Sequence, residues 1–379
     1  MRKGHHKTNR RDEKGRRRPD REERRAPTRD PRPPVATVRL PGRVKIPPIA
    51  KLATLPTVGK WLWTCRDGFE AQLFEELCWQ KCSATVLGSG LVETDRQPAT
   101  PPTFARMGFR IDALVRTPQE AAAALPQHPS RVQVWVPDTD AGNARAGECL
   151  AWESTINALR DGIKDPSTPW SAFESGASLG QVCLVAPHTA AVGSIGARVA
   201  LSLAPGGRAR MKRTAAAPSR AAMKLDEALE WVGVSPGKGD LCVDLGSAPG
   251  GWTRRLLERG ARVWSVDTGL LAPDVAKHPR VRHFHQTAFA FVPDEPCDWL
   301  FCDMAWRPLE VAQLLAKWAR NRWATQMVAN IKLPMKDKLP MVLRMRATLE
   351  AGGWSNVHLR QLYHDRDEVT VQAVRGPNT

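Results

Sequence analysis

The stretch at residues 242–252, CVDLGSAPGGW, constrains the fold of this 379-residue chain more than any other. The apolar run Leu241–Leu245 predicts a buried strand, a glycine-rich turn follows at residues 246–251, and residues 252–260 predict a helix closed by glycine. Because glycine has no Cβ, such a turn lets the backbone approach a ligand closely, and the helix N-terminus favours an anion. The spacing is not G-x-G-x-x-G, which disfavours a dinucleotide site. A turn that only closes the strand–helix unit is the simpler alternative.

The positive charge of the chain is concentrated at its start. The first 50 residues hold 17 Lys and Arg against 6 Asp and Glu, which is +11 of the total net charge of +17. Residues 1–60 show almost no apolar periodicity, so we predict a disordered basic extension there. This extension is either an electrostatic arm on RNA or a solvated segment of little function.

Several classes of protein are disfavoured by the composition. No apolar run approaches the roughly 18 residues that span a bilayer, and the first ten residues lack the apolar core of a secretory signal. None of the eight cysteines forms a C-x-x-C pair, and Cys78 and Cys82 have no second pair to complete a zinc site. His283 and His285 share a face of one predicted strand but lack a third ligand. We therefore expect a cytoplasmic protein with reduced thiols, no membrane segment and no metal, and a monomer.

Residues 61–208 mix strand and helix patterns. Strands are predicted at residues 61–65, 85–87, 90–92, 131–136 and 181–185, and helices at residues 69–81 and 151–163. The clean alternation at residues 131–136 is typical of a half-exposed strand. No nucleophile–base pair is evident, so this segment predicts an α+β binding domain. The basic connector at residues 205–213 either contacts phosphates or is an exposed linker.

From residue 209 onward helices and strands alternate regularly. Ser219 is a candidate N-cap for a helix at residues 220–232, and further helices are predicted at residues 309–318 and 339–351. Strands are predicted at residues 241–245, 262–267, 281–285, 298–303, 324–332, 355–360 and 368–374. This alternation predicts an open, mostly parallel sheet with helices on both faces.

Polar residues end successive strands of that predicted sheet. In such sheets ligands bind beyond the carboxyl ends of the strands, where the glycine turn, Asp267, Asp303 and Lys332 all fall. Asp267 lies 23 residues after Asp244, at the place where α/β folds put a carboxylate on ribose hydroxyls. Singly, Asp303 could be a helix cap and Lys332 a surface lysine. Together these residues indicate a binding site.

Four segments carry a resemblance to a known family. DLGSAPGGWT, FCDMAWRP, NIKLPMK and QLYHDRDEVTV resemble the ribosomal RNA large-subunit 2′-O-ribose methyltransferases of type M. WTCRDGFEAQL and VWVPDTD are similar to the THUMP-related RNA-binding part of that family. The resemblance covers residues 61–379 and leaves residues 1–60 without a counterpart. It implies a THUMP-like, ferredoxin-like α+β domain at residues 61–208. A Rossmann-like class I methyltransferase domain would follow at residues 209–379, with a seven-stranded sheet whose last strand is antiparallel.

The resemblance also implies S-adenosylmethionine as methyl donor and a catalytic tetrad of Lys224, Asp303, Lys332 and Glu368. A ribose 2′-hydroxyl is a very weak acid, so its methylation benefits from a base that takes the proton. A lysine can be that base when burial or a neighbouring cation favours its uncharged form. Lys224 would be the neighbouring cation for Lys332, with Asp303 and Glu368 orienting the two amines. An antiparallel last strand would bring Glu368 to the carboxyl ends of the parallel strands.

The cofactor contacts implied by the resemblance form a longer set. They are Ser219, Ala248, Pro249, Gly250, Gly251, Asp267, Thr287 and Asp303. Thr287 stands where the family often has an acid. Its hydroxyl can still hydrogen-bond an adenine amino group.

Other methyl-transfer chemistries fit less well. Methylation of a base carbon needs a cysteine nucleophile, and Cys302 falls in a strand that we expect to be buried. Methylation of an exocyclic amine typically uses Asp/Asn-Pro-Pro-aromatic, whereas this chain reads Asp-Met-Ala-Trp at residues 303–306. Trp306 and Tyr363 either stack on an RNA base or pack in the core.

The resemblance thus implies methylation of a cytidine 2′-hydroxyl in the peptidyl-transferase region of 23S ribosomal RNA, free or in a large-subunit precursor. The alternative is an RNA-binding or assembly protein that keeps the fold without turnover.

Overall fold

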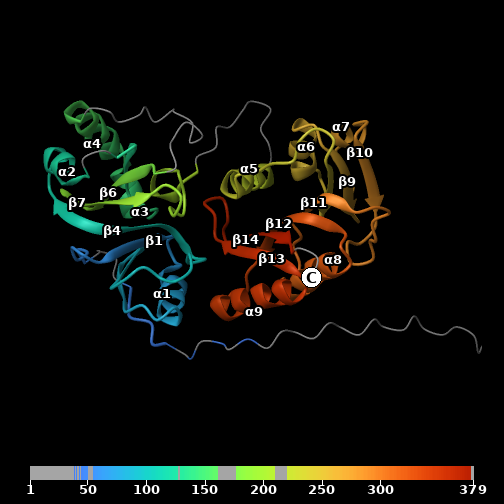
Figure 1. The fold of residues 1–379 in the computed structure, drawn as a ribbon, viewed down its shortest axis with the longest axis horizontal. Coiled ribbons are helices and arrows are strands. Elements are labelled where there is room, and N and C mark those ends of the chain that lie inside the picture. Colours follow the sequence, from blue (N-terminus) through green and yellow to red (C-terminus); the bar gives the residue numbers. More distant parts are fainter. Residues whose placement is uncertain are drawn as a thin grey trace, which may run out of the picture. The chain divides into compact units, whose positions relative to one another are not determined.

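The computed structural model describes residues 38, 40, 42, 44–49, 54–126, 129–160, 176–209 and 220–376. Most of the predicted basic extension, and Ser219, lie outside these residues. The described part contains two seven-stranded sheets, the first within residues 61–196 and the second within residues 241–375 (Figure 1). None of the described helices is long and apolar enough to cross a membrane.

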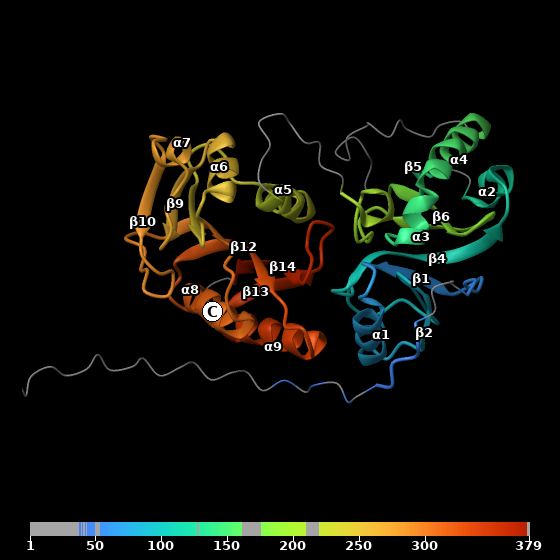
Figure 2. The same cartoon turned by 180° about the vertical axis from the view of Figure 1, so that it is seen from behind.

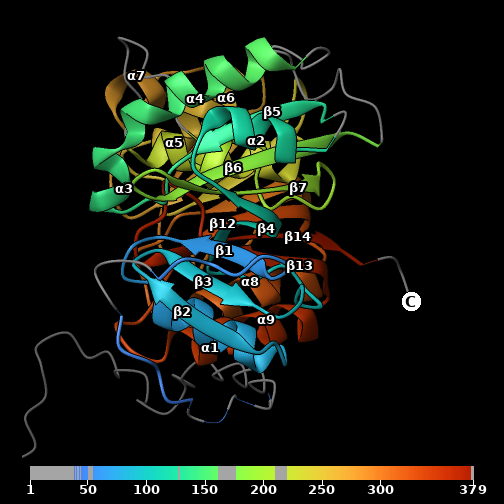
Figure 3. The same cartoon turned by 90° about the vertical axis from the view of Figure 1, so that its left-hand side faces the viewer.

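The first sheet has the order β2-β3-β1-β4-β7-β6-β5. Its strands are β1 (Trp61–Cys65), β2 (Ala84–Gly88), β3 (Leu91–Thr94), β4 (Ala105–Val115), β5 (Arg131–Trp135), β6 (Ser178–Ala186) and β7 (Thr189–Gly196). All pairs are antiparallel except β5 with β6. Helix α1 (Glu70–Trp79) lies against β2 and β3, whereas α2 (Pro118–Ala124) and α4 (Ala146–Leu159) lie at the other end of the sheet (Figure 3). The short α3 (Asp140–Ala144) precedes α4.

One prediction for this sheet is wrong. All five residues of β5 are buried, although their alternation predicted a half-exposed strand. The side chain of Gln133 is satisfied inside the protein, because it donates to Leu203 O at 2.7 Å and accepts from Gln181 Nε2 at 2.7 Å. Alternating polarity therefore reports side-chain pairing here rather than exposure to water.

Two strands of this sheet, β4 and β7, have no clear sequence signal. β7 reads TAAVGSIG, and its alanines and glycines have low strand propensity. The strand forms because it is held between β4 and β6, where Gly193 lets the neighbouring backbone come close.

The second sheet has the order β10-β9-β8-β11-β12-β14-β13. Its strands are β8 (Leu241–Leu245), β9 (Arg262–Asp267), β10 (Val281–His285), β11 (Cys297–Cys302), β12 (Ala324–Lys332), β13 (Trp354–Arg360) and β14 (Glu368–Arg375). β8 to β12 are mutually parallel, while β14 runs antiparallel to both β12 and β13. The prediction of a mostly parallel sheet with an antiparallel last strand is confirmed, and this is the class I methyltransferase fold.

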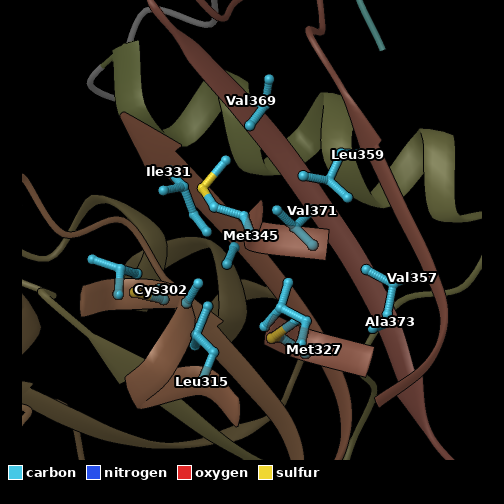
Figure 4. Close-up of a cluster of buried hydrophobic side chains, with 14 of the residues drawn as sticks. Cys302, Leu315, Met327, Ile331, Met345, Val357, Leu359, Val369, Val371 and Ala373 are labelled. Carbon is cyan, nitrogen blue, oxygen red and sulfur yellow. The ribbon is translucent and has the colours of Figure 1, made fainter. Parts of the chain in front are cut away.

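Helices cover both faces of the second sheet, as predicted. They are α5 (Arg220–Val232), α6 (Gly251–Glu258), α7 (Pro273–Ala276), α8 (Pro308–Arg320) and α9 (Lys338–Ala351). α6 and α7 lie beside β9 and β10 (Figure 2). α8 and α9 pack on one face through a buried cluster in which Ile331, Val369 and Val371 meet Met345 of α9 (Figure 4). α5 and α6 pack on the other face, against Val328 and Phe301.

The period of two along a strand sends alternate residues to opposite faces. Ile331, Val369 and Val371 face the α8–α9 layer, so Lys332, Glu368 and Thr370 face the layer that contains α5. The packing of the apolar residues thereby fixes which polar side chains are presented to α5.

The close approach at Gly193 makes a testable prediction about stability. A Cβ at this position would lie 2.0 Å from Arg110 O and 2.9 Å from Phe109 Cδ2, so the backbone itself would have to move. We expect Gly193→Ala to lower the free energy of unfolding by about 1–3 kcal/mol or more. The matched control is Gly147→Ala in α4, where no heavy atom lies within 4 Å of the added Cβ. Urea unfolding should show the control unchanged or slightly more stable, and equal stabilities of the two variants would contradict the prediction.

Candidate active site

Four side chains predicted for catalysis meet on the α5 face of the second sheet. Lys332 is the last residue of β12 and pairs directly across the ladder with Glu368, the first residue of β14. Asp303 follows the end of β11, and Lys224 projects from α5, the helix that covers this face. Residues 144 positions apart in the chain thus share one contact, between Lys224 and Glu368.

Glu368 joins the two lysines. Its Oε1 accepts a hydrogen bond from Lys332 Nζ at 2.5 Å, and its Oε2 accepts one from Lys224 Nζ. Asp303 Oδ1 lies 4.0 Å from Lys332 Nζ. The side chain of Lys332 is 35% exposed and that of Lys224 only 13%, so Lys332 is the amine that an incoming substrate can reach.

Burial and the two lysines shift the pKa values of the cluster's carboxyl groups in opposite directions, and a different effect prevails at each group. Burial alone would raise the pKa of Glu368, but hydrogen bonds from Lys224 and Lys332 and the charges of both amines bring it below its ordinary value. Burial raises the pKa of Asp303, and the two lysines offset this only in part. Asp303 Oδ1 is buried and has no hydrogen-bond partner among the described residues. The site therefore retains an acceptor for a donor on a ligand.

A second set of polar residues supports the cluster and was missed by the sequence reading. Asn330 Oδ1 lies 3.4 Å from Lys224 Nζ, and Asn330 Nδ2 donates to Asp365 Oδ1 at 2.6 Å. Thr370, which pairs with Asn330 across the ladder, donates to Asp365 Oδ2 at 3.0 Å. Asn330 is two residues before Lys332, so strand alternation would have placed it on the same face. Asp365 lies in the β13–β14 loop, where no periodic pattern reveals it.

The glycine turn after β8 adopts backbone conformations that favour glycine. Gly246 has φ of +78° and Gly250 has φ of +110°. A Cβ at Gly246 would lie 2.6 Å from Met304 Cγ, next to Asp303 in the chain. The absent side chain lets the turn pack closely against Met304, beside the catalytic cluster.

Asp267 organises this turn from the end of β9. Its Oδ2 accepts a hydrogen bond from Ala248 N at 3.0 Å, and its Oδ1 accepts one from Gly269 N at 2.7 Å. Each oxygen keeps a second lone pair. Asp267 therefore both holds the turn and remains able to accept from ribose hydroxyls.

The remaining predicted cofactor residues differ in placement. Gly251 begins α6 directly after Gly250, whereas Pro249 and Thr287 are exposed. The Thr287 hydroxyl lies 3.4 Å from the backbone N–H of Phe289. Ser219 lies outside the described residues, so its contact stays a prediction.

Asp244, in β8 two residues before the glycine turn, is a buried carboxyl that the sequence left without a predicted role. Its Oδ2 accepts from Thr253 Oγ1 at 2.7 Å, and its Oδ1 has no partner among the described residues. Burial raises its pKa from 3.8 to about 7, against the opposing hydrogen bond from Thr253. The glycine turn, Asp267 with spare lone pairs and two buried carboxyl oxygens that accept no hydrogen bond from the described residues together fit a polar ligand with amino and hydroxyl donors.

The other candidates from the sequence fall outside this arrangement. Cys302 is fully buried, as predicted, and burial raises its pKa to about 12, which leaves almost no thiolate. The ring nitrogens of His283 lie 3.2 Å from Ser265 Oγ and 3.1 Å from Gly269 O. No three potential metal ligands gather anywhere in the described part of the chain. Trp306 is half-exposed and donates to Glu310 Oε2 at 2.7 Å.

The raised pKa of Asp244 predicts a pH dependence of stability. Because its folded pKa of about 7 exceeds its ordinary 3.8, its favourable contribution is complete below pH 3.8 and is lost as the pH rises through about 7. In Asp244→Asn this loss is removed. Urea unfolding of both proteins between pH 5 and pH 8.5 should show the variant gaining stability relative to the natural protein as the pH rises. Parallel curves would show that Asp244 does not carry this proton.

Comparison with known proteins supplies the family. Residues 217–333 match the family of FtsJ-like methyltransferases. The chain is 35% identical over 339 residues to the ribosomal RNA large subunit methyltransferase M of Halorhodospira halophila, which covers 83% of this chain and 96% of that one. It is 33% identical over 363 residues to the protein of the same name from Alkalilimnicola ehrlichii, with 83% and 94% covered. The chain therefore belongs to the ribosomal RNA large subunit methyltransferase M family and is a methyltransferase.

Proposed function

We propose that this enzyme methylates the 2′-hydroxyl of a cytidine in the peptidyl-transferase region of 23S ribosomal RNA. The RNA is free or part of a large-subunit precursor, and the enzyme acts in the cytoplasm as a monomer. The observation that carries the proposal is the shared carboxylate of Glu368, which holds Lys224 and Lys332 together beside Asp303 and the glycine turn. Relatives that span most of the chain are named for ribosomal RNA, which supports this class of substrate.

S-adenosylmethionine, when bound, supplies a methyl group on a positively charged sulfur, which is already activated for transfer. In the proposal the backbone of residues 246–251 lies against the amino-acid end of this cofactor. Asp267 accepts from its ribose hydroxyls, and Thr287 lies on the adenine side. Asp303 offers Oδ1, which accepts no hydrogen bond from the described residues, to the donor groups of the cofactor. Ser219, Ala248, Pro249, Gly250 and Gly251 complete the proposed contacts.

Lys332 is the proposed base. In its uncharged form its Nζ takes the proton from the 2′-hydroxyl, and it is the more exposed of the two amines. Lys224 places a second positive charge at Glu368, which attracts the developing alkoxide. Glu368 holds both amines in place. Asp303 balances the positive charge of the amines on the side from which the substrate approaches.

We assign RNA binding to the first sheet. The proposed THUMP-like domain comprises residues 61–208, and the catalytic domain comprises residues 209–379. Gln361 N donates to Thr103 O at 2.8 Å, and Arg66 Nη1 donates to Asp365 O at 3.0 Å, so residues after β1 and before β4 contact the β13–β14 loop. The basic extension, residues 1–60, is proposed to add contacts to RNA phosphates. The alternative of a non-catalytic assembly protein has less support, because both lysines and both carboxylates are in place.

Replacing the proposed base separates catalysis from binding. We expect Lys332→Ala to lower the rate of methyl transfer by about 10²- to 10⁴-fold, while the dissociation constant for S-adenosylmethionine changes by no more than about twofold. Single-turnover transfer to 23S RNA transcripts and calorimetric titration of the cofactor measure the two quantities. The matched control is Lys238→Ala, an exposed lysine in the loop before β8. Unchanged methylation by Lys332→Ala would overturn the assignment of the base.

The acceptor is tested by mapping 2′-O-methyl groups on 23S ribosomal RNA from cells with and without this protein. The proposal expects one ribose methyl, on a cytidine, to disappear. No change at any ribose would contradict the proposed acceptor, even if cofactor binding is intact.

The glycine turn makes a separate prediction about the cofactor. Gly246→Ala must adopt φ near +78° with its Cβ 2.6 Å from Met304 Cγ. Strain of this kind costs about 1–3 kcal/mol, so we expect cofactor affinity to fall by about tenfold or more. Gly237→Ala is the matched control, since nothing lies within 4 Å of its added Cβ. Calorimetric affinities that are equal for the two variants would argue against the turn as the cofactor cradle.

A further inference from the structure

A cavity of about 560 Å³ lies next to the catalytic cluster. One side is formed by Met223, which precedes Lys224 on α5, and by residues of the β13–β14 loop that lead to Glu368. The other side comes from the first sheet, through Arg66 after β1 and Asp140 at the start of α3. A volume of this size is within the range of small-ligand sites, and its walls belong to both sheets.

Tyr363, the only tyrosine in the chain, lines this cavity and is held firmly. The buried carboxylate of Glu227, one helical turn after Lys224, accepts from the backbone N–H groups of Tyr363 at 2.7 Å and His364 at 2.9 Å. It also contacts His364 Nδ1 at 2.7 Å. Glu227 therefore ties the backbone of Tyr363 and His364 to the helix that carries Lys224.

The side chain of Tyr363 is partly exposed at this cavity, although two arginines lie near its ring. The guanidinium of Arg106 lies 5.1 Å from the ring centre and that of Arg208 5.9 Å away. Neither arginine lines this cavity, and Arg106 instead lines a neighbouring cavity of about 720 Å³. The ring of His364 lies 5.2 Å from that of Tyr363, yet Tyr363 remains partly exposed and borders both cavities.

Both arginines and aspartates line the cavity, which suits the phosphate and the base of a nucleotide. Arg66 and Arg366 offer cations for a phosphate backbone. Asp67 and Asp140 are exposed and form no ion pair with any residue that the structure describes. Carboxylates accept hydrogen bonds from the exocyclic amino groups of bases, as they do with cytosine N4. They repel a phosphate, so a phosphate is favoured at the arginines and a base between the aspartates.

We infer that this cavity binds a nucleobase of the RNA strand next to the ribose that is methylated, stacked on Tyr363. Its amino group faces Asp67 and Asp140, so cytosine, adenine and guanine are accepted in preference to uracil, which has no amino group. The inference rests on the proposed function, since it requires RNA as the substrate.

The test is equilibrium binding of short single-stranded oligoribonucleotides to the full chain without methyl donor, followed by fluorescence anisotropy. A base that stacks on an aromatic side chain gains binding free energy, so Tyr363→Leu is expected to weaken binding of oligocytidylate about tenfold. Tyr363→Phe keeps the ring and should retain most of the affinity. The double variant Asp67→Asn, Asp140→Asn should reduce the preference for oligocytidylate over oligouridylate by several-fold.

Glu227→Gln tests the support of the ring. It removes the charge that holds the loop and should weaken oligocytidylate binding several-fold. Glu230→Gln, an exposed glutamate on the same helix, is the matched control and should bind as the natural protein does. Thermal melting identifies any variant that fails to fold. If Tyr363→Leu fails to fold, the inference is decided by the double variant Asp67→Asn, Asp140→Asn and by Tyr363→Phe.

The outcomes separate this inference from the proposed function. If the natural protein binds neither oligonucleotide, this inference fails, and the mapping of 2′-O-methyl groups decides the proposed function separately. If it binds RNA but Tyr363→Leu binds equally well, or Tyr363→Phe loses as much as Tyr363→Leu, only the stacking site is overturned. An aspartate double variant with an unchanged base preference overturns the assignment of the amino-group acceptors.

Discussion

The reversal of β14 is the constraint on which the rest of the site depends. A parallel strand at this position would begin at the opposite edge of the sheet and carry Glu368 away from Lys332. Because β14 is antiparallel, its first residue pairs with the last residue of β12, and the carboxylate meets the amine across the ladder. Asn330 and Thr370 repeat the same pairing two residues deeper, which aligns the supporting polar residues behind the catalytic ones.

The apolar side of the sheet determines the polar side. Ile331, Val369 and Val371 are fully buried against the α8–α9 layer, and each lies between polar residues that face α5. A shift of one residue in the pairing would exchange the two faces and bury Lys332 in the core. Hydrophobic packing of this cluster (Figure 4) thus sets the register that brings Lys332 and Glu368 together.

Much of the second sheet was predictable because its signals are local. The strand–helix alternation and the acids and lysine at strand ends predicted the topology and placed Asp303 and Lys332 at one edge, and the resemblance to a known family added Lys224 and Glu368. The polarity pattern of β5 failed because Gln133 is paired with Gln181 inside the protein. Asp365 and Glu227 escaped notice because their roles come from contacts with the β13–β14 loop, and no sequence spacing reports such contacts.

The β13–β14 loop and the adjacent Arg360 contact the amino-terminal part of the chain, and these contacts affect how the protein unfolds. Arg360, at the end of β13, is buried and donates to Leu201 O and Arg106 O, both from the amino-terminal part of the chain. Burial lowers its pKa to about 10. Separating the two sheets would leave these carbonyl oxygens without their hydrogen bonds from Arg360 and would loosen the loop that precedes Glu368. The amino-terminal and carboxy-terminal sheets should therefore melt in one cooperative transition, with catalysis lost at the same temperature as the contact between them.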